Sequence, residues 1–139
     1  MVEDDALQRI VETARTTAGV VAVYLFGSQA DGSAGIASDV DLAVLGDNPL
    51  AFAALIDLQL RFADELATPV DLIDLLTADA FLALDIIRGE RLFCRDAALA
   101  DAYELFVMRR AGDLEPFERE RRRVVMGTPV TTRTPRSEG

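Results

Sequence analysis

The chain has 139 residues, of which 50% are hydrophobic, so it has the size of one domain with one buried core. Its formal net charge of −10 argues against a general nucleic-acid-binding surface, which needs a clustered excess of Lys and Arg to neutralise phosphates. All 14 basic residues are arginine, and the absence of Lys and His excludes a Ser-His-Asp triad, a Lys Schiff base and a His general base, which leaves carboxylates and metal ions as the available catalysts.

The N-terminal segment predicts a helix and then a strand. Apolar residues at three- and four-residue spacing predict a helix that begins at Asp4 or Asp5 and ends near Thr16. Residues 20–26 are β-branched or aromatic and too few for a buried helix. They therefore predict a strand, which Gly27 ends.

The next segment predicts a loop, a second strand and a helix. Residues 28–36 contain several turn-forming residues and predict a short helix or turn followed by a loop. Alternation over residues 39–45 predicts a strand, and residues 46–49 predict a turn. Pro49 is expected at the first position of a helix that ends near Leu66, because Pro is tolerated there. Its expected core positions are Leu55, Ile56, Leu58, Phe62 and Leu66.

The C-terminal half continues the alternation of strands and helices. Residues 70–75 predict a third strand, residues 78–88 a helix and residues 91–94 a short fourth strand, and a last helix begins near Asp96. Aromatic residues at apolar positions are expected in the core: Tyr24, Phe52, Phe62, Phe81, Tyr103 and Phe106. The arginine-rich residues 109–123 predict a solvated helix face, with a nucleic-acid or partner-docking surface as the alternative.

This alternation predicts one α/β or α+β domain over residues 1–125, with a small mixed sheet of about four strands flanked by helices. Residues 126–139 offer little to bury and predict a disordered tail. The longest apolar stretches fall well short of the roughly 20 residues of a membrane span, and residues 1–5 are acidic where a signal peptide is basic. We therefore expect a soluble, cytoplasmic protein without a membrane partner.

Cys94 is the only cysteine, which excludes an intrachain disulfide and a cysteine-based zinc cluster. We expect it to be a reduced, buried small side chain.

Two aspartates at the start of the second predicted strand are candidate metal ligands. Asp39 and Asp41 lie two residues apart, so on a strand they share one face with α-carbons about 6.5 to 7 Å apart. Two carboxylates at that separation can converge on Mg²⁺, which binds one or two carboxylates together with substrate phosphates. Taken alone, the pair is more often an exposed strand edge.

A third acid changes this balance. Asp71 lies on the next predicted strand, and if that strand neighbours the Asp39 strand, the three carboxylates face one cleft. Such a set can hold two metal ions about 4 Å apart for in-line displacement at phosphorus. Asp74 is the rival for this role. It faces the opposite side of a regular strand, so a helix cap or loop acid is the better interpretation.

Gly27 and Ser28 follow the first predicted strand and form a candidate phosphate-binding turn. Free backbone N–H groups and a hydroxyl can hold phosphate oxygens there, and Gly permits their close approach. The dipeptide alone is more often an ordinary turn. The aspartates that follow Ser28 after ten residues favour the functional interpretation.

These segments together resemble a known family. Leu25-Phe-Gly-Ser, Ser38-Asp-Val-Asp-Leu-Ala-Val and Val70-Asp-Leu-Ile-Asp-Leu are similar to the motifs of minimal nucleotidyltransferases in the DNA polymerase β superfamily, most of all the MNT antitoxins that are paired with HEPN-domain toxins. The similarity covers about residues 5 to 110, and its motifs are fairly specific.

The resemblance implies a fold, a reaction and roles for these residues. Asp39 and Asp41 would bind two Mg²⁺ ions, Asp71 would be the third ligand and help activate the attacking hydroxyl, and Gly27 and Ser28 would hold the triphosphate of ATP. The implied reaction transfers AMP to a hydroxyl and releases pyrophosphate. In the antitoxin members the acceptor is a tyrosine of the HEPN toxin, so a toxin partner is expected.

The chain departs from the family pattern after Ser28. Members usually carry Arg-x-Arg-Gly at a position where this chain has Gln29-Ala30-Asp31-Gly32. A bound triphosphate would then depend more on Mg²⁺ and backbone dipoles. Two alternatives therefore stay open: a binding module that neutralises its partner by occlusion, and a small-molecule nucleotidyltransferase of the aminoglycoside-modifying type. The second usually needs an extra domain, for which little chain remains.

Overall fold

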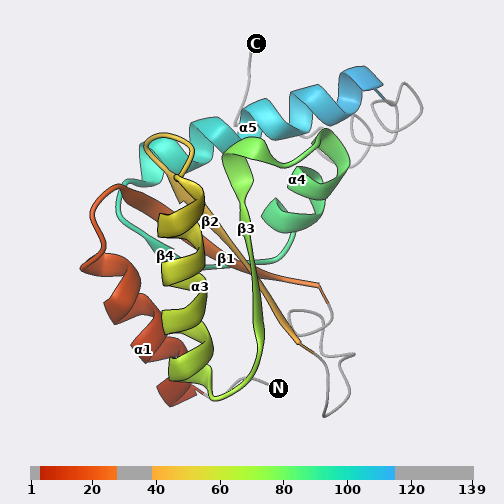
Figure 1. The fold of residues 1–139 in the computed structure, drawn as a ribbon. Helices are drawn as coiled ribbons and strands as arrows, with labels where there is room; N and C mark the ends of the chain where they lie inside the picture. The colour runs from red at the N-terminus through yellow and green to blue at the C-terminus, as the bar shows by residue number, and fades with distance from the viewer. Residues whose placement is uncertain (1–3, 28–38, 115–139) are drawn as a thin grey trace.

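The computed structural model describes residues 4–27 and 39–114, which form one mixed sheet with helices on both faces (Figure 1). The strands are β1 (Val20–Phe26), β2 (Val40–Gly46), β3 (Val70–Asp74) and β4 (Glu90–Cys94). The helices are α1 (Asp4–Arg15), α3 (Phe52–Leu66), α4 (Ala80–Ile87) and α5 (Ala97–Leu114), with a single 3-10 turn, η1 (Leu75–Thr77), after β3. The predicted α/β class, with a four-stranded mixed sheet, is confirmed.

The sheet has the order β3-β2-β1-β4. β1 pairs antiparallel with both β2 and β4, whereas β2 and β3 are parallel. A parallel pair needs a crossover connection, and α3 supplies it. The register sets Asp41 opposite Asp71 on one side and opposite Phe26 on the other. The third strand therefore neighbours the second, which is the arrangement that a shared site for Asp41 and Asp71 requires.

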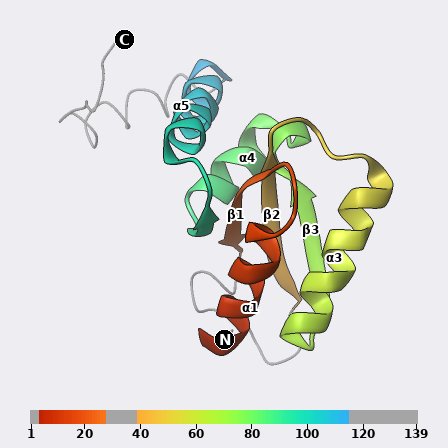
Figure 2. The same cartoon turned by 90° about the vertical axis from the view of Figure 1, so that its left-hand side faces the viewer.

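Each face of the sheet has its own apolar core, and Figure 2 shows α4 and α5 on one side of the strands and α1 and α3 on the other. The largest buried side chains on the α1 and α3 face are Ile10, Leu42, Leu58 and Phe62. Those on the α4 and α5 face are Tyr24, Leu75, Ile86 and Val107. Successive strand residues alternate between the two cores, so position along a strand decides the face of each side chain.

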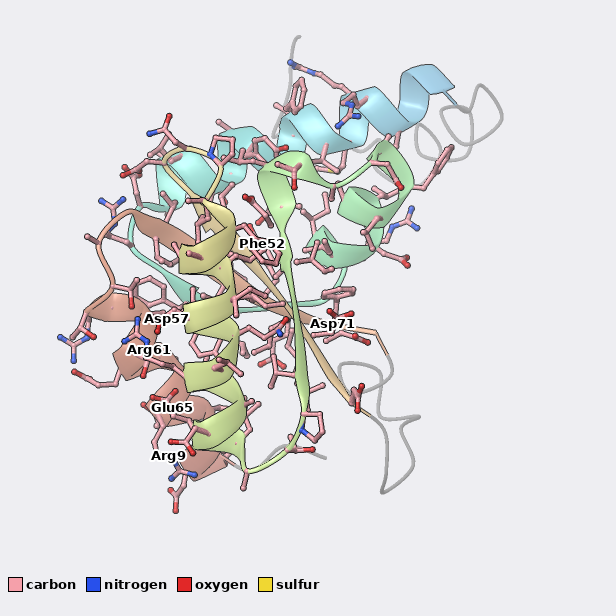
Figure 3. All side chains as sticks on the ribbon, in the orientation of Figure 1. Arg9, Phe52, Asp57, Arg61, Glu65 and Asp71 are labelled. Carbon is pink, nitrogen blue, oxygen red and sulfur yellow. The ribbon has the colours of Figure 1, made fainter. Side chains whose placement is uncertain are left out.

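Polar contacts join α1 to α3 on the face of the sheet that these two helices cover (Figure 3). Arg9 donates hydrogen bonds from Nε and Nη2 to the carbonyl oxygen of Glu65, at 3.3 and 3.0 Å. The hydroxyl of Thr13 donates to the carboxylate of Glu65, and Arg61 forms an ion pair with Asp57 one helical turn earlier.

A second polar network ties β1, β4 and α5 together. The hydroxyl of Tyr24 donates to Oε2 of Glu104 at 2.6 Å, and Arg91 pairs with Glu104 and Asp101 at 2.9 Å each. Burial, reinforced by the hydrogen bond and the charge of Glu104, raises the pKa of Tyr24 well above its ordinary value. The only polar side chain on the buried strand β1 is thus fully partnered.

The start of α3 differs from the prediction. The helix begins at Phe52, with Ala51 in an extended conformation before it, so Pro49 is not the first helical residue. Leu50 donates its backbone N–H to Oδ2 of Asp74 at 2.9 Å, and this contact holds the connection extended. The prediction is wrong because a residue 24 positions away, rather than the local sequence, decides where the helix begins.

Three aromatic residues expected in the core are exposed. Phe52, Phe81 and Phe106 have exposed fractions of 78%, 52% and 49%, whereas Phe62 and Tyr24 are fully buried as predicted. Helical spacing places each of these residues on an apolar face of its own helix. The other described residues leave about half or more of each side chain exposed. Cys94 is half-buried and free.

Ser28, the loop predicted for residues 28–36 and the tail predicted for residues 126–139 lie outside the described residues. Among the helices that are described, none is both long enough and apolar enough to cross a membrane.

Candidate functional site

Three aspartates lie at the end of the sheet where β1 stops and β2 and β3 begin. Asp39 immediately precedes β2 and is exposed, and Asp41 is the second residue of β2 and partly buried. Asp71 is the second residue of β3, exposed, and directly opposite Asp41 in the parallel register. In Figure 3 Asp71 projects from β3 on the side away from α3. The two strands therefore bring Asp41 and Asp71 together on the α4 and α5 face.

The local sequence explains this placement. Val40 and Leu42 are buried in the α1 and α3 core, as are Val70 and Leu72 on β3. Alternation along each strand then turns the intervening aspartate to the opposite face. The apolar neighbours fix the orientation of both acids, because a register slip of one residue would bury the charges and expose the core.

Gly27 packs directly against the Asp41 carboxylate. Its φ of +75° is a left-handed conformation that favours glycine. A Cβ added at this position would lie 2.5 Å from Oδ2 of Asp41, closer than non-bonded atoms approach. Glycine is therefore needed at the end of β1 for two independent reasons, the backbone conformation and the space that Asp41 occupies.

The electrostatics of this end are those of an uncompensated anionic site. Burial is the main cause that raises the pKa of Asp41, and the neighbouring charges of Asp71 and Asp39 raise it further. In the described part of the chain, none of the three carboxylates has an ion pair or a hydrogen bond. A cation bound among them would remove the mutual repulsion.

The three aspartate side chains alone do not form a complete coordination sphere for a metal ion. Within residues 4–27 and 39–114, no three His, Cys, Asp or Glu side chains are grouped closely enough to hold a metal ion. The donor set nevertheless fits Mg²⁺, which binds through one or two carboxylates and takes its remaining ligands from water and substrate phosphates. Asp41 and Asp71, which the parallel register sets side by side, would supply such carboxylates.

Asp74 has the role of a structural cap. Its Oδ1 accepts the N–H of Leu76 at 3.0 Å, capping η1, and its Oδ2 accepts the N–H of Leu50. It is buried and faces away from Asp71 along the strand. The interpretation of Asp74 as a cap rather than the third acid of the site is confirmed.

One feature beside the site was not singled out from the sequence. Gly89, between α4 and β4, packs so tightly on the end of β1 that an added Cβ would clash with the carbonyl of Leu25 and lie 3.0 Å from Cα of Phe26. In the sequence Gly89 marks only the end of a helix. A small residue just before a short strand was the available signal for this close approach.

The opposite end of the sheet carries an apolar groove of about 340 Å³. Its lining includes Leu45, Leu76, Leu99, Tyr103 and Phe106. None of the three aspartates lines it, so the groove is separate from the acidic end.

Comparison with known proteins agrees with this geometry. The family model "Polymerase beta, Nucleotidyltransferase" matches residues 8–98 of the chain. The protein adenylyltransferase MntA of Shewanella oneidensis is 30% identical over 104 residues, which span 74% of this chain and 72% of MntA.

Solved structures show the same fold. A toxin-antitoxin crystal structure with AMP-PNP aligns with a TM-score of 0.65 and 24% identity over 89% of this chain and 96% of its own. A complex of a tri-AMPylated Shewanella oneidensis HEPN toxin with an MNT antitoxin aligns with a TM-score of 0.61 and 24% identity over 86% of this chain and 92% of its own. The expected resemblance to the MNT antitoxins is confirmed, and the chain belongs to the polymerase beta nucleotidyltransferase family.

Proposed function

We propose that this protein is a Mg²⁺-dependent nucleotidyltransferase that transfers AMP from ATP to a hydroxyl, a tyrosine hydroxyl by preference, of a HEPN-domain toxin, and so acts as an antitoxin. The observation that carries the proposal is the pairing of Asp41 with Asp71 on parallel strands, with Gly27 against the Asp41 carboxylate. The similarity to MntA, a protein adenylyltransferase, supports the same reaction.

In the proposed reaction, the acceptor oxygen attacks the α-phosphorus of ATP. A bond forms between that oxygen and phosphorus, the bond to the β-phosphate oxygen breaks, and pyrophosphate leaves. Asp39, Asp41 and Asp71 would hold the magnesium ions, which neutralise developing negative charge on the phosphates when bound. Asp71 is exposed, so a hydroxyl of a partner protein can reach it and give up its proton to the carboxylate.

The turn after β1 would hold the triphosphate. Gly27 lets the chain turn directly beside the Asp41 carboxylate, and the backbone N–H groups and hydroxyl that follow, with Ser28 first, are the expected donors. Asp41 lies against this turn, so the phosphates and the carboxylates would meet around the same cations.

The test is incubation with α-³²P-labelled ATP, Mg²⁺ and a candidate HEPN partner protein. We expect label on the partner with the wild-type protein and none with Asp41→Asn or Asp71→Asn. Asp64→Asn, which removes an exposed acid of α3 on the opposite face of the sheet, is the matched control and should transfer label normally. Equal labelling by all three variants would refute the catalytic roles.

Neutralisation by occlusion remains the second candidate, since the Gln29-Ala30-Asp31 segment lacks the arginines that usually accompany the phosphate-binding turn. It predicts that the Asp39→Asn/Asp41→Asn variant still protects cells from the toxin. Transfer of AMP to an aminoglycoside, the third candidate, is tested by including such antibiotics as acceptors in the labelling assay.

A further inference from the structure

The segment that follows β1 contains no positively charged residue before Gly32. Residues 27–32 are Gly-Ser-Gln-Ala-Asp-Gly, and the aspartate adds a negative charge. Phosphate groups are held most effectively by charge-assisted hydrogen bonds, for which the planar guanidinium of arginine is well suited. Any arginine that binds a nucleoside triphosphate at this end of the sheet, beside Mg²⁺, therefore comes from another segment.

Most arginines in the described residues already have partners. Ion pairs or hydrogen bonds engage Arg9, Arg15, Arg61, Arg91 and Arg95, and Arg110 lies over the ring of Phe106 at 6.0 Å. Within residues 4–27 and 39–114, only Arg88 and Arg109 are exposed arginines that make neither an ion pair nor a hydrogen bond through the guanidinium. These two guanidinium groups are available to bind an anion.

Arg88 lies next to the acidic end. It caps the C-terminus of α4, and Gly89 follows it and packs on Leu25 and Phe26 at the end of β1. The register pairs Leu25 with Glu90, so Gly89 falls beside Phe26, and Phe26 pairs in turn with Asp41. With strands about 4.8 Å apart, Gly89 lies roughly 10 Å from Asp41, on the far side of β1.

α4 also covers the correct face. Its residues Ala83, Leu84 and Ile86 pack in the same core as Phe26 and Ala43. Ala43 follows Asp41 by two positions on β2, so α4 and the Asp41 carboxylate lie on one face of the sheet. Arg88 therefore lies on the same face of the sheet as the carboxylates, with the end of β1 between them.

We propose that Arg88 binds the β- and γ-phosphates of the nucleoside triphosphate that the Asp39, Asp41 and Asp71 end accepts, and that it supplies the positive charge missing from the turn after Gly27. This inference rests on the proposed function. Arg109 is the matched control, because it is an equally unpaired arginine on α5, which Figure 1 shows along the opposite side of the molecule from the acidic end.

The test is isothermal titration calorimetry, with Mg²⁺, of an ATP analogue that carries a methylene group between the α- and β-phosphates, and of AMP. We use wild type, Arg88→Gln, Arg88→Lys and Arg109→Gln, each checked for an unchanged melting curve without ligand. Arg88→Gln should bind the analogue about tenfold or more weakly, because a charge-assisted hydrogen bond is lost, and should bind AMP within twofold of wild type. Arg88→Lys should recover part of the lost affinity. Arg109→Gln should bind the analogue as tightly as wild type does.

The outcomes separate the two proposals. If wild type binds the analogue and Arg88→Gln binds it equally well, Arg88 does not contact the phosphates and the proposed function stands. An equal loss for the analogue and AMP would also refute the assignment to the β- and γ-phosphates. If wild type shows no Mg²⁺-dependent binding of the analogue, both the proposed function and the role of Arg88 are refuted.

Discussion

The two aspartates of β3 have opposite environments although they lie only three positions apart in the sequence. Asp74 is buried and accepts two backbone N–H groups, whereas Asp71 is exposed and without a partner in the described residues. The same contrast holds between the ends of the sheet, since Asp47 at the far end pairs with Arg95 at 3.0 Å. Acids that stabilise this fold are partnered, and acids that gather unpartnered are available for a cation and a substrate.

The largest expected effect is a loss of AMP transfer on substitution of a glycine, and it tests the comparison between the two ends of the sheet. Gly27 and Gly19 both have positive φ, of +75° and +84°, but an added Cβ meets Asp41 only at Gly27. Gly27→Ala should lower AMP transfer by about 100-fold or more, since it displaces a carboxylate of the site. Gly19→Ala should cost about 1 kcal/mol of unfolding free energy through backbone strain and leave transfer unchanged.

Labelling rates and urea denaturation of both glycine variants provide this measurement. A similar loss of transfer in Gly19→Ala would mean that backbone strain, and not the contact with Asp41, is responsible.

Alanine at each aspartate of β3 tests the contrast in stability. Asp74→Ala should lower the free energy of unfolding by about 3 kcal/mol, because the N–H groups of Leu50 and Leu76 lose their acceptor. Asp71→Ala should change it by less than about 0.5 kcal/mol, as exposed substitutions usually do. Urea denaturation of the two variants at pH 7 measures both. Equal destabilisation would contradict the division between structural and functional acids.

Tyr24 tests a partnered polar group inside the sheet. Tyr24→Phe should cost about 1 kcal/mol, the contribution of a typical hydrogen bond, here to Glu104. Because folding raises the pKa of Tyr24, the protonated hydroxyl stabilises the fold below the ordinary tyrosine pKa of about 10, and this stability is lost as pH rises above it. Denaturation between pH 8 and 11 should therefore show a steeper loss for wild type than for Tyr24→Phe. Parallel curves would show that folding does not raise the pKa of Tyr24.

The smallest expected effect is a gain in the free energy of unfolding when one charge is removed from the acidic end. Because folding raises the pKa of Asp41, its ionised form opposes folding, and this cost appears as pH rises above the ordinary aspartate value of about 3.9. In metal-free buffer at pH 7, Asp41→Asn should be more stable than wild type by less than about 1 kcal/mol, the scale of partly solvated charge interactions. The difference should vanish near pH 3. A destabilised variant at pH 7 would show that Asp41 has a stabilising partner.

Much of the fold and the geometry of the site followed from local patterns. Alternation along the strands sets the faces of Asp41 and Asp71, and the helix between β2 and β3 explains their parallel pairing. The prediction that Asp74 is a cap followed from the same alternation. Roles in metal and nucleotide binding for these acids, Gly27 and Ser28 stay predictions.

Other features depend on contacts that no local pattern contains. The hydrogen bond from Leu50 to Asp74 delays the start of α3. The exposure of Phe81 and Phe106 depends on which helix faces stay uncovered, and helical spacing cannot indicate that. The packing of Gly89 on β1 joins segments more than 60 residues apart, so the position of Arg88 beside the acidic end required the structure.

Ligand-dependent melting tests the central claim, that unpartnered acids form a cation and nucleotide site, most directly. A ligand that binds only the folded protein stabilises it by RT ln(1 + [L]/Kd) and so raises its melting temperature as the free ligand concentration exceeds Kd. Mg²⁺ together with the methylene ATP analogue should raise the melting temperature of wild type by several degrees, and that of Asp41→Asn by much less. An equal rise in both proteins, or no rise in wild type, would contradict the account.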